Sequence, residues 1–365
     1  MIVKDEAAVI VRCLASIKPF IDYWVIVDTG STDGTQEVIK KYMYDIPGVL
    51  YQSNWVNFSY NRNEALRLSD NKGEYILFID ADEQFLPDPD FSFSFLKGDY
   101  YLCPFTMENG QQFQKVLVIK NSPHFFWVGA VHEMIANDEK TCRGILVDKA
   151  KVAYLSGGYR SRDSLTFEKD ALLLKQEVEK HPKNTRSLFF LALTYERLNH
   201  LELALEYFEK RSQLLERDQE VFYSILSIGL IQMRQGKPAQ IFLKTLEKAH
   251  HLIETRPEPI YFLSITYESQ GKLQKAYNLL SPFVYSFDRS SIGYQTFFNL
   301  NIAEIEIPVL YARICFRLLK YEESCKVFEK IKSNPSLPKE KIKYIESYLR
   351  KMRPDKEIKS SISFF

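Results

Sequence analysis

The chain has 365 residues and a hydrophobic content of 45%, which is enough to bury one large core or two ordinary ones. Its 48 Lys and Arg residues nearly balance its 47 Asp and Glu residues, so we expect no nucleic-acid partner and only local charge-driven binding. The 5 cysteines form no CxxC pair, which argues against a zinc module or a disulfide framework and favours a reduced, cytoplasmic setting. We expect neither a signal peptide nor a transmembrane segment, because no apolar run is long enough for either.

Short β-branched or aromatic runs alternate with helical patterns through about residue 120. The runs lie at residues 1–3, 23–28, 49–53, 74–80, 99–105 and 114–120. A helix is expected over residues 7–17, capped by Asp5, and another over residues 35–43, opened by a capping box of Asp33 and Gln36. A third helix is expected over residues 60–68. The alternation is typical of an α/β domain in which helices cover a parallel sheet.

From about residue 165 the strand runs disappear and a helical period takes over. Residues 186–210 and 258–283 share one layout, with an aromatic-rich first helix, a Tyr before the turn (Tyr195, Tyr267) and a small residue after it (Ala204, Ala276). This layout resembles a tetratricopeptide repeat, in which small residues let paired helices approach closely. Residues 220–249 and 306–331 carry weaker versions, so we expect three to four degenerate units, with a generic helical bundle as the alternative.

These patterns predict a domain boundary near residue 155. We expect an α/β domain over residues 1–155, a linker or bridging helix over 156–180, helical repeats over 181–353 and a flexible tail over 354–365. Residues 157–162 combine two glycines with Arg160 and Arg162, a composition that fits both a flexible linker and a mobile strap that closes over a diphosphate.

Polar residues follow the second strand run, where Asp28 leads into a Gly-rich turn. Ligands of open α/β sheets bind beyond the carboxyl ends of the strands, so Asp28 is a candidate to accept hydrogen bonds from a ribose or a nucleobase. The alternative is that Asp28 and Ser31 only shape the turn. For Asp33 we prefer that structural role, as a helix cap.

Three acids stand within four positions, Asp80 to Glu83, directly after an apolar strand run. Unpaired carboxylates beside a core are costly, so the sequence predicts a group that neutralises them. Mg²⁺ or Mn²⁺ bridging a diphosphate would do so, because these ions prefer oxygen ligands and stabilise a departing diphosphate. A solvated acidic loop is the alternative.

Four ordered motifs, MIVKDE, VDTGSTDGT, YNRNEAL and FIDADE, occupy about the first 85 residues. In this order and spacing they resemble family 2 glycosyltransferases, whose GT-A fold contains a Rossmann-like, mostly parallel sheet. With the helical repeats behind them, they resemble bacterial enzymes that couple this domain to tetratricopeptide repeats, similar to lipopolysaccharide-core glucosyltransferases and peptide S- or O-glycosyltransferases. The resemblance implies an inverting, metal-dependent hexosyltransferase that uses a nucleotide sugar, expected to be a UDP-sugar.

The resemblance also implies roles for the motif residues. Those expected to contact the nucleotide sugar are Val3, Asp5, Glu6, Asp28, Arg62, Asn63, Asp80, Ala81 and Asp82, together with Arg160 of the strap. Asp82 is expected to ligate Mn²⁺ or Mg²⁺, and Asp80 to bind ribose or a metal-bound water. For Arg62 the alternative is an ordinary salt bridge on its helix.

His132 and Glu133 follow an aromatic-rich run. Inverting transfer needs a general base, so Glu133 is the candidate base, with Asp138 and Glu139 as rivals. His132 is a candidate metal ligand or phosphate contact, or a structural histidine, and Trp127 either lines the sugar pocket or belongs to the core.

Three departures from the family pattern concern the site. Thr29 stands where many relatives carry a second acid that contacts the base. The chain begins inside the first strand, so a shortened strand is expected. Residues 154–156 replace a stretch where related enzymes have a His.

The sequence leaves three functions to distinguish. The first is a glycosyltransferase whose repeats recognise the acceptor, a peptide, a protein or a glycolipid, or mediate homo-oligomerisation. The second is a catalytically weak or inactive scaffold that binds protein through its repeats. The third, a nucleotidyltransferase, is disfavoured because the sequence has no Gly-rich, Lys-bearing phosphate loop near the first strand.

Overall fold

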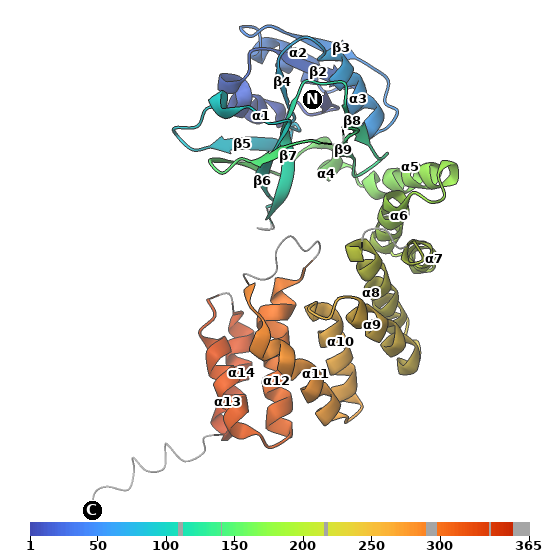
Figure 1. Ribbon diagram of the computed structural model, residues 1–365, viewed down its shortest axis with the longest axis vertical. Helices are drawn as coiled ribbons and strands as arrows, with labels where there is room; N and C mark the ends of the chain where they lie inside the picture. Colours follow the sequence, from blue (N-terminus) through green and yellow to red (C-terminus); the bar gives the residue numbers. More distant parts are fainter. Residues whose placement is uncertain (109–111, 140, 215–217, 290–297, 336, 353–365) are drawn as a thin grey trace, which may run out of the picture. The chain divides into compact units, whose positions relative to one another are not determined.

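The computed structural model describes residues 1–108, 112–139, 141–214, 218–289, 298–335 and 337–352, so the predicted tail at 354–365 lies outside the described residues. The chain divides into two compact units, Met1–His200 and Leu201–Phe365 (Figure 1). The predicted order, an α/β region followed by a helical region, is confirmed. The predicted boundaries at residues 155 and 180 stay predictions, and the first compact unit extends beyond them to His200.

The first sheet is parallel and has the order β1-β2-β3. Its strands are β1 (Ile2–Val3), β2 (Trp24–Asp28) and β3 (Gly48–Gln52). Helices α1 (Ile10–Ile17), α2 (Thr35–Tyr42) and α3 (Phe58–Leu68) connect or follow these strands. As its helical spacing predicts, α1 buries Ile10, Cys13, Leu14 and Ile17.

The predicted cap of α1 by Asp5 is wrong, because the N-cap of α1 is Val9. The predicted capping box of α2 forms only in part: Oδ1 of Asp33 accepts a hydrogen bond from the amide of Thr35, the first residue of α2, at 3.0 Å, but the side chain of Gln36 donates to Asp28. The N-cap position of α2 is Gly34, which takes φ 90°, a conformation that glycine adopts without strain.

A second, six-stranded sheet has the order β4-β7-β6-β11-β5, with β10 also paired to β6. Its members are β4 (Tyr75–Leu77), β5 (Glu83–Pro87), β6 (Tyr100–Thr106), β7 (Gln112–Lys120), β10 (Gly144–Leu146) and β11 (Ala150–Tyr154). β6 runs parallel to β10 and β11, whereas the other pairs of this sheet are antiparallel. Strands β8 (Phe125–Val128) and β9 (Met134–Asn137) form a separate hairpin.

Three helices complete the first unit: α4 (Tyr159–Arg162), α5 (Thr166–Lys180) and α6 (Thr185–Arg197). Asn184 caps α6, since its side chain accepts a hydrogen bond from the amide of Ser187. The helices α5 and α6 pack against each other, which buries Leu174 and Leu188. The region predicted as a linker or bridging helix is therefore largely helical.

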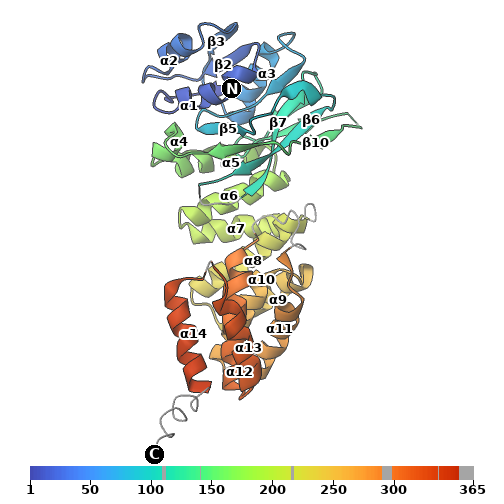
Figure 2. The ribbon, with the colours of Figure 1, turned by 90° about the vertical axis from the view of Figure 1, so that its left-hand side faces the viewer.

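The second unit is built from successive packed helices. They are α7 (Leu201–Ser212), α8 (Asp218–Arg234), α9 (Ala239–Leu252), α10 (Pro257–Ser269), α11 (Leu273–Ser286), α12 (Ile307–Arg317), α13 (Tyr321–Lys332) and α14 (Lys339–Met352), with a π-helical turn at Ile302–Glu306. Figure 2 shows α12 and α13 side by side, as expected of paired repeat helices. Ala204 and Ala276 are fully buried, so small residues do lie where helices approach closely.

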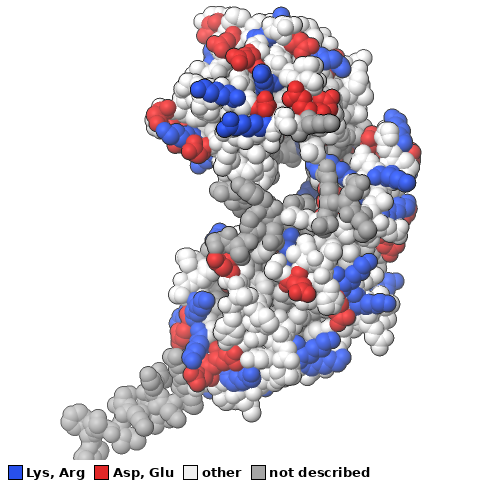
Figure 3. Space-filling model, viewed as in Figure 1, with Lys and Arg blue, Asp and Glu red and all other residues white. Residues whose placement is uncertain are grey.

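Charged side chains of both signs are interspersed on the visible face of the helical unit (Figure 3), which agrees with the balanced composition. No helix within the described ranges is long and apolar enough to cross a membrane.

Candidate active site

Asp28 lies at the end of β2, in register with Val3 of β1. The Asp28 side chain is fully buried, and its Oδ1 accepts hydrogen bonds from the amides of Gly30 and Ser31 and from Nε2 of Gln36. Its second oxygen, Oδ2, is buried and has no hydrogen-bond partner among the described residues. Buried carboxylate oxygens are normally hydrogen-bonded, so Oδ2 is an acceptor available to a ligand. Val3 is buried and contributes its carbonyl, which accepts from the amide of Thr29.

Asp5 organises the loop beyond β1. It has φ 51°, its Oδ1 accepts a hydrogen bond from the amide of Thr32 at 2.7 Å, and its amide donates to Oγ of Ser31 at 2.9 Å. Its carbonyl accepts from Nη2 of Arg162 at 2.6 Å. These contacts tie the loops after β1 and β2 to the segment around α4, which is a structural task for Asp5.

Only one of the two carboxylate oxygens of Glu6 has a hydrogen-bond partner among the described residues. Its Oε1 accepts a hydrogen bond from the amide of Tyr159 at 3.0 Å, whereas Oε2 is buried without a partner in the described part of the chain. Burial, and then the charge of Asp82, raise the pKa of Glu6 to about 7. Glu6 therefore lies near the acids that follow β4, although 76 residues separate it from Asp82 in the sequence.

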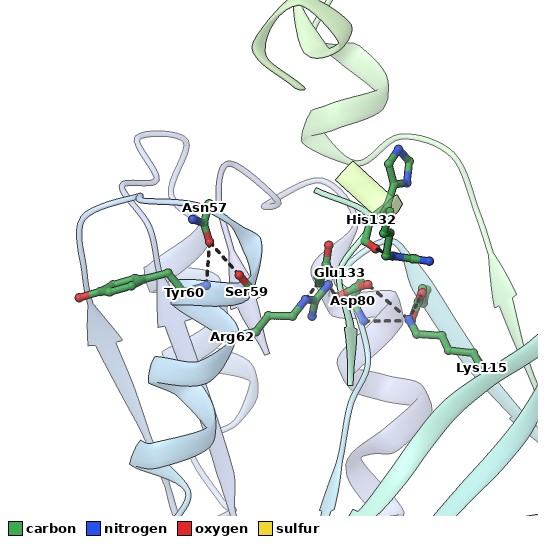
Figure 4. Close-up of polar contacts among 10 residues, drawn as sticks. Asn57, Ser59, Tyr60, Arg62, Asp80, Lys115, His132 and Glu133 are labelled. Atoms are coloured by element: carbon green, nitrogen blue, oxygen red, sulfur yellow. Dashed lines mark hydrogen bonds and ion pairs between the residues drawn. The ribbon is translucent and has the colours of Figure 1, made fainter. Parts of the chain in front are cut away.

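The three acids after β4, Asp80, Asp82 and Glu83, form an acid cluster. Two cations already pair with most of it. Asp80 pairs with Nη2 of Arg62 at 2.8 Å and with Nζ of Lys115 at 3.3 Å, and Lys115 also pairs with Glu83 (Figure 4). Burial opposes ionisation of Asp80, but Arg62 and Lys115 outweigh it and hold the pKa of Asp80 well below its usual range. The expectation that a metal must neutralise these acids is corrected, because the protein supplies Arg62 and Lys115 for Asp80 and Glu83.

Lys115 was not among the predicted site residues. It lies in β7, 35 residues beyond Asp80, and its Nζ lies 5.4 Å from the centre of the Phe105 ring. Burial lowers its pKa, but Asp80 and Glu83 raise it by more, so the ammonium stays charged. The one signal in the sequence is a lysine directly before the apolar part of a strand run, residues 116–119.

Asp82 differs from its neighbours because no ion pair holds its carboxylate within the described residues. Burial and the charge of Asp80 raise its pKa. The backbone of Gly158 lies against it, since a Cβ on Gly158 would meet Oδ2 of Asp82 at 2.7 Å. Ala81 beside it is buried. One free carboxylate fits a Mn²⁺ or Mg²⁺ that takes its remaining ligands from phosphate and water.

Arg62 connects the acid cluster with Glu133. From α3 its Nε donates to Oε1 of Glu133 at 2.6 Å while Nη2 reaches Asp80, and its guanidinium lies 4.9 Å from the centre of the Trp127 ring (Figure 4). These partners lie outside its own helix, so the expected alternative of a salt bridge along α3 does not describe it. Asn63 bonds both the amide and the carbonyl of Trp127 at 2.8 Å, which makes it a support for Trp127.

His132 and Glu133 lie in the turn between β8 and β9, but their side chains diverge (Figure 4). The His132 ring stacks on Phe190 of α6 at 4.1 Å between centroids, and burial lowers its pKa to about 4. The structure does not bring His132 to the acid cluster. No group of three or more His, Cys, Asp or Glu side chains could hold a metal in the part of the chain that the structure describes.

The remaining candidates have other partners. Arg160 forms two hydrogen bonds with buried Asp170, at 3.2 and 2.7 Å, and lies over the Phe58 ring, so the predicted diphosphate contact would require it to leave these partners. Asp138 and Glu139 both pair with exposed His124. Of the three predicted bases, only Glu133 is joined to the acid cluster, through Arg62.

Comparison with known proteins identifies the family of the N-terminal residues. Residues 1–93, which include every candidate from Val3 to Asp82, match the family model described as glycosyl transferase family 2. The N-terminal domain is a family 2 glycosyltransferase domain. Glu133, His132 and Arg160 lie beyond the matched residues.

Two relatives extend the comparison of this family 2 domain. SunS, a prophage-derived glycosyltransferase of Bacillus subtilis, is 26% identical over 267 residues, which cover 68% of this chain and 61% of SunS. A TPR repeat-containing protein of Synechococcus elongatus is 38% identical over 87 residues, which cover 24% of this chain and 20% of that protein. The chain thus spans less than two thirds of the length of either relative.

Among solved structures, the crystal structure of MamA is 17% identical, covers 48% of this chain and 94% of its own, and has a TM-score of 0.36. A score this low carries no argument about the fold. The tetratricopeptide-like repeats behind the family 2 domain are therefore identified from the packed helix pairs.

Proposed function

We propose that this protein transfers a sugar from a nucleotide sugar, a UDP-sugar, to an acceptor with inversion at the anomeric carbon. The observation that carries the proposal is a pair of carboxylates in a family 2 domain. Oδ2 of Asp28, after β2, is buried without a hydrogen-bond partner, and Asp82, after β4, has no ion pair among the described residues. Ligands of α/β sheets bind beyond such strand ends.

The two acids suit the two ends of a nucleotide diphosphate. Oδ2 of Asp28 is a buried acceptor for an N–H of the base or a hydroxyl of the ribose. Asp82, with Asp80 beside it, would hold Mn²⁺ or Mg²⁺, which supplies Lewis-acid stabilisation to the departing diphosphate. Arg62 would take part of the charge of the phosphates while it keeps Asp80 ionised.

Glu133 is the proposed general base. Its carboxylate would accept the proton of the acceptor as the acceptor attacks the anomeric carbon. The 2.6 Å contact with Arg62 fixes one carboxylate oxygen and leaves the other for the acceptor. Because Arg62 also holds Asp80, the proposed base and the proposed nucleotide site share one anchor.

The helical repeats would recognise the acceptor, a peptide, a protein or a glycolipid, or join two copies of the chain. Stacked helix pairs form extended surfaces suited to such recognition. The proposal places this activity in the cytoplasm.

The test is a screen of nucleotide sugars by release of the free nucleotide, followed by Asp82→Asn under the best conditions. Asp82→Asn keeps the shape but removes the charge, so we expect turnover to fall at least about 100-fold, as for loss of a principal charge-stabilising group. Asp90→Asn is the matched control, since Asp90 is exposed and pairs with Lys149 at the surface. Equal turnover in the wild type and Asp82→Asn would reject the assignment.

The second candidate is a scaffold that binds protein through its repeats and has lost catalysis, and the helical second unit favours it. The two candidates differ in their response to UDP with Mn²⁺. A ligand that binds only the native state raises the melting temperature, so an enzyme shows a shift that the scaffold lacks.

A further inference from the structure

The start of α6 holds the turn that carries Glu133. Nε and Nη2 of Arg186 both donate to the carbonyl oxygen of His132, at 3.2 and 2.8 Å. The ring of His132 stacks on Phe190, one helical turn beyond Arg186, and the Arg186 guanidinium lies 4.7 Å from the centre of the same ring. The backbone and the side chain of His132 are therefore both fixed by one helix.

The turn itself needs such support. His132 has φ 53° and Gly129 has φ 99°, and a left-handed conformation at a non-glycine residue persists only where its surroundings stabilise it. The turn is also bonded to α3, since the amide of Phe58 at the start of that helix donates to the carbonyl of Ala130 at 3.2 Å. Helices α3 and α6 thus both hold the turn, immediately before Glu133.

The orientation of Glu133 follows from these contacts. The carbonyl of His132 belongs to the peptide plane that includes the amide nitrogen of Glu133, so fixing that oxygen fixes the plane from which the Glu133 side chain departs. At the far end, the carboxylate of Glu133 must meet Nε of Arg62 at 2.6 Å. A small rotation of the peptide would displace the carboxylate from Arg62.

We infer that Arg186 is a positioning residue for Glu133, so that the first helix pair after the catalytic domain, α5 and α6, completes the active site. The inference rests on the proposed function, in which Glu133 is the base. Arg186 itself contacts neither substrate nor the reacting atoms. Its effect passes through the His132 carbonyl, and a misplacement of about 1 Å at a reacting group can cost about 100-fold in rate.

The test compares Arg186→Gln and Arg186→Lys in the full chain, with Arg197→Gln as the matched control. Arg197 lies on the same helix and is exposed, but it stacks over Phe167, at 5.2 Å, and makes no hydrogen bond to the His132 turn. We expect Arg186→Gln to lower kcat about 10- to 100-fold while the donor KM and the UDP-induced melting shift stay near those of the wild type. Arg186→Lys, which can still donate to the carbonyl, recovers part of kcat, and Arg197→Gln keeps the wild-type value.

Three results would overturn the inference: an unchanged kcat in Arg186→Gln, a rise in donor KM at constant kcat, or an equal loss in Arg197→Gln. If the wild type turns over no nucleotide sugar, the proposed function fails separately. Crystal structures of the wild type and Arg186→Gln then decide the positioning role. Glu133 displaced from Arg62 in the variant supports it, and Glu133 still paired with Arg62 contradicts it.

Discussion

Residues that neighbour each other in the sequence have different environments in the acid cluster. Asp80 and Glu83 are paired with internal cations, whereas Asp82 between them is not. The charges of Arg62 and Lys115 keep Asp80 ionised, while burial and Asp80 itself make ionisation of Asp82 less favourable. A cation that approaches this segment therefore meets one carboxylate whose charge is not already offset.

The ion pair between Lys115 and Glu83 is expected to contribute to the stability of the fold. Lys115→Met leaves Glu83 buried without its cation, and removing one partner of a buried pair is costly, so we expect the free energy of unfolding to fall by about 3 kcal/mol. Urea unfolding measures this loss. Lys120→Met, at the exposed end of the same strand, is the control and stays within about 0.5 kcal/mol of the wild type.

The double variant Lys115→Met/Glu83→Gln separates the ion pair from the packing of the lysine chain. We expect it to be more stable than Lys115→Met alone, because the amide carries no charge that needs a partner. A double variant no more stable than Lys115→Met would show that the aliphatic stem of Lys115, and not its charge, carries the effect.

At the scale of elements, the β8–β9 hairpin depends on partners outside its own sheet. Its turn is bonded to the start of α3 and to α6, and Trp127 of β8 is bonded to Asn63. Strand pairing alone fixes the register of the hairpin, but the contacts with two helices fix its place in the molecule. The turn therefore presents Glu133 only when both helices are folded.

The buried His132 makes the stability of this hairpin depend on pH. The pKa of His132 is about 4 in the folded chain, below its ordinary value of 6.5, so between these values the unfolded chain binds more protons. Stability from His132 is thus complete above about pH 6.5 and is lost as the pH falls toward 4.

His132→Asn tests this dependence, because Asn tolerates the positive φ and does not titrate. We expect the stability advantage of the wild type over the variant, measured by urea unfolding, to shrink as the pH falls from 6.5 to 4. His181→Asn, at the exposed end of α5, is the control. A constant difference across this range would contradict the assigned protonation.

At the scale of the whole molecule, the first compact unit includes α4, α5 and α6 as well as the two sheets. Three residues of these helices form hydrogen bonds to the sheet domain: the amide of Tyr159 to Glu6, Arg162 to the carbonyl of Asp5, and Arg186 to the carbonyl of His132. All three reach loops at the candidate active site. The helical unit from Leu201 onward has a separate core.

Truncated chains test whether the first unit ends near residue 155, as the sequence predicts, or at His200. We expect residues 1–200 to unfold cooperatively and to retain the melting shift with UDP and Mn²⁺, because the truncation keeps the complete first unit. Residues 1–155 lack all three joining contacts and should melt lower and bind UDP more weakly. Calorimetry of both truncations beside the full chain measures this, and equal behaviour of the two would show that α4 to α6 contribute nothing to the site.

Local sequence patterns predicted much of this protein. Strand runs located the strands of the first sheet and β6 and β7, the 3.6-residue period identified the buried face of α1, and the ordered motifs gave the family of the N-terminal domain. Each of these depends on neighbouring positions in the chain. The predicted cap of α1 failed because the Asp5 side chain bonds to the loop after β2, which helix-capping preferences do not take into account. Asp33 does bond to the first residue of α2, but its other oxygen bonds to the loop after β1.

The tertiary structure alone decided the environment of the acids after β4. The sequence by itself placed Asp80, Asp82 and Glu83 together, but the ion pairs that distinguish them come from Arg62 and Lys115, on a helix and a strand elsewhere in the unit. Likewise, Arg186 reaches His132 across 54 residues. Such pairs are set by strand register and by the direction of each side chain, and these become defined only when distant segments pack together.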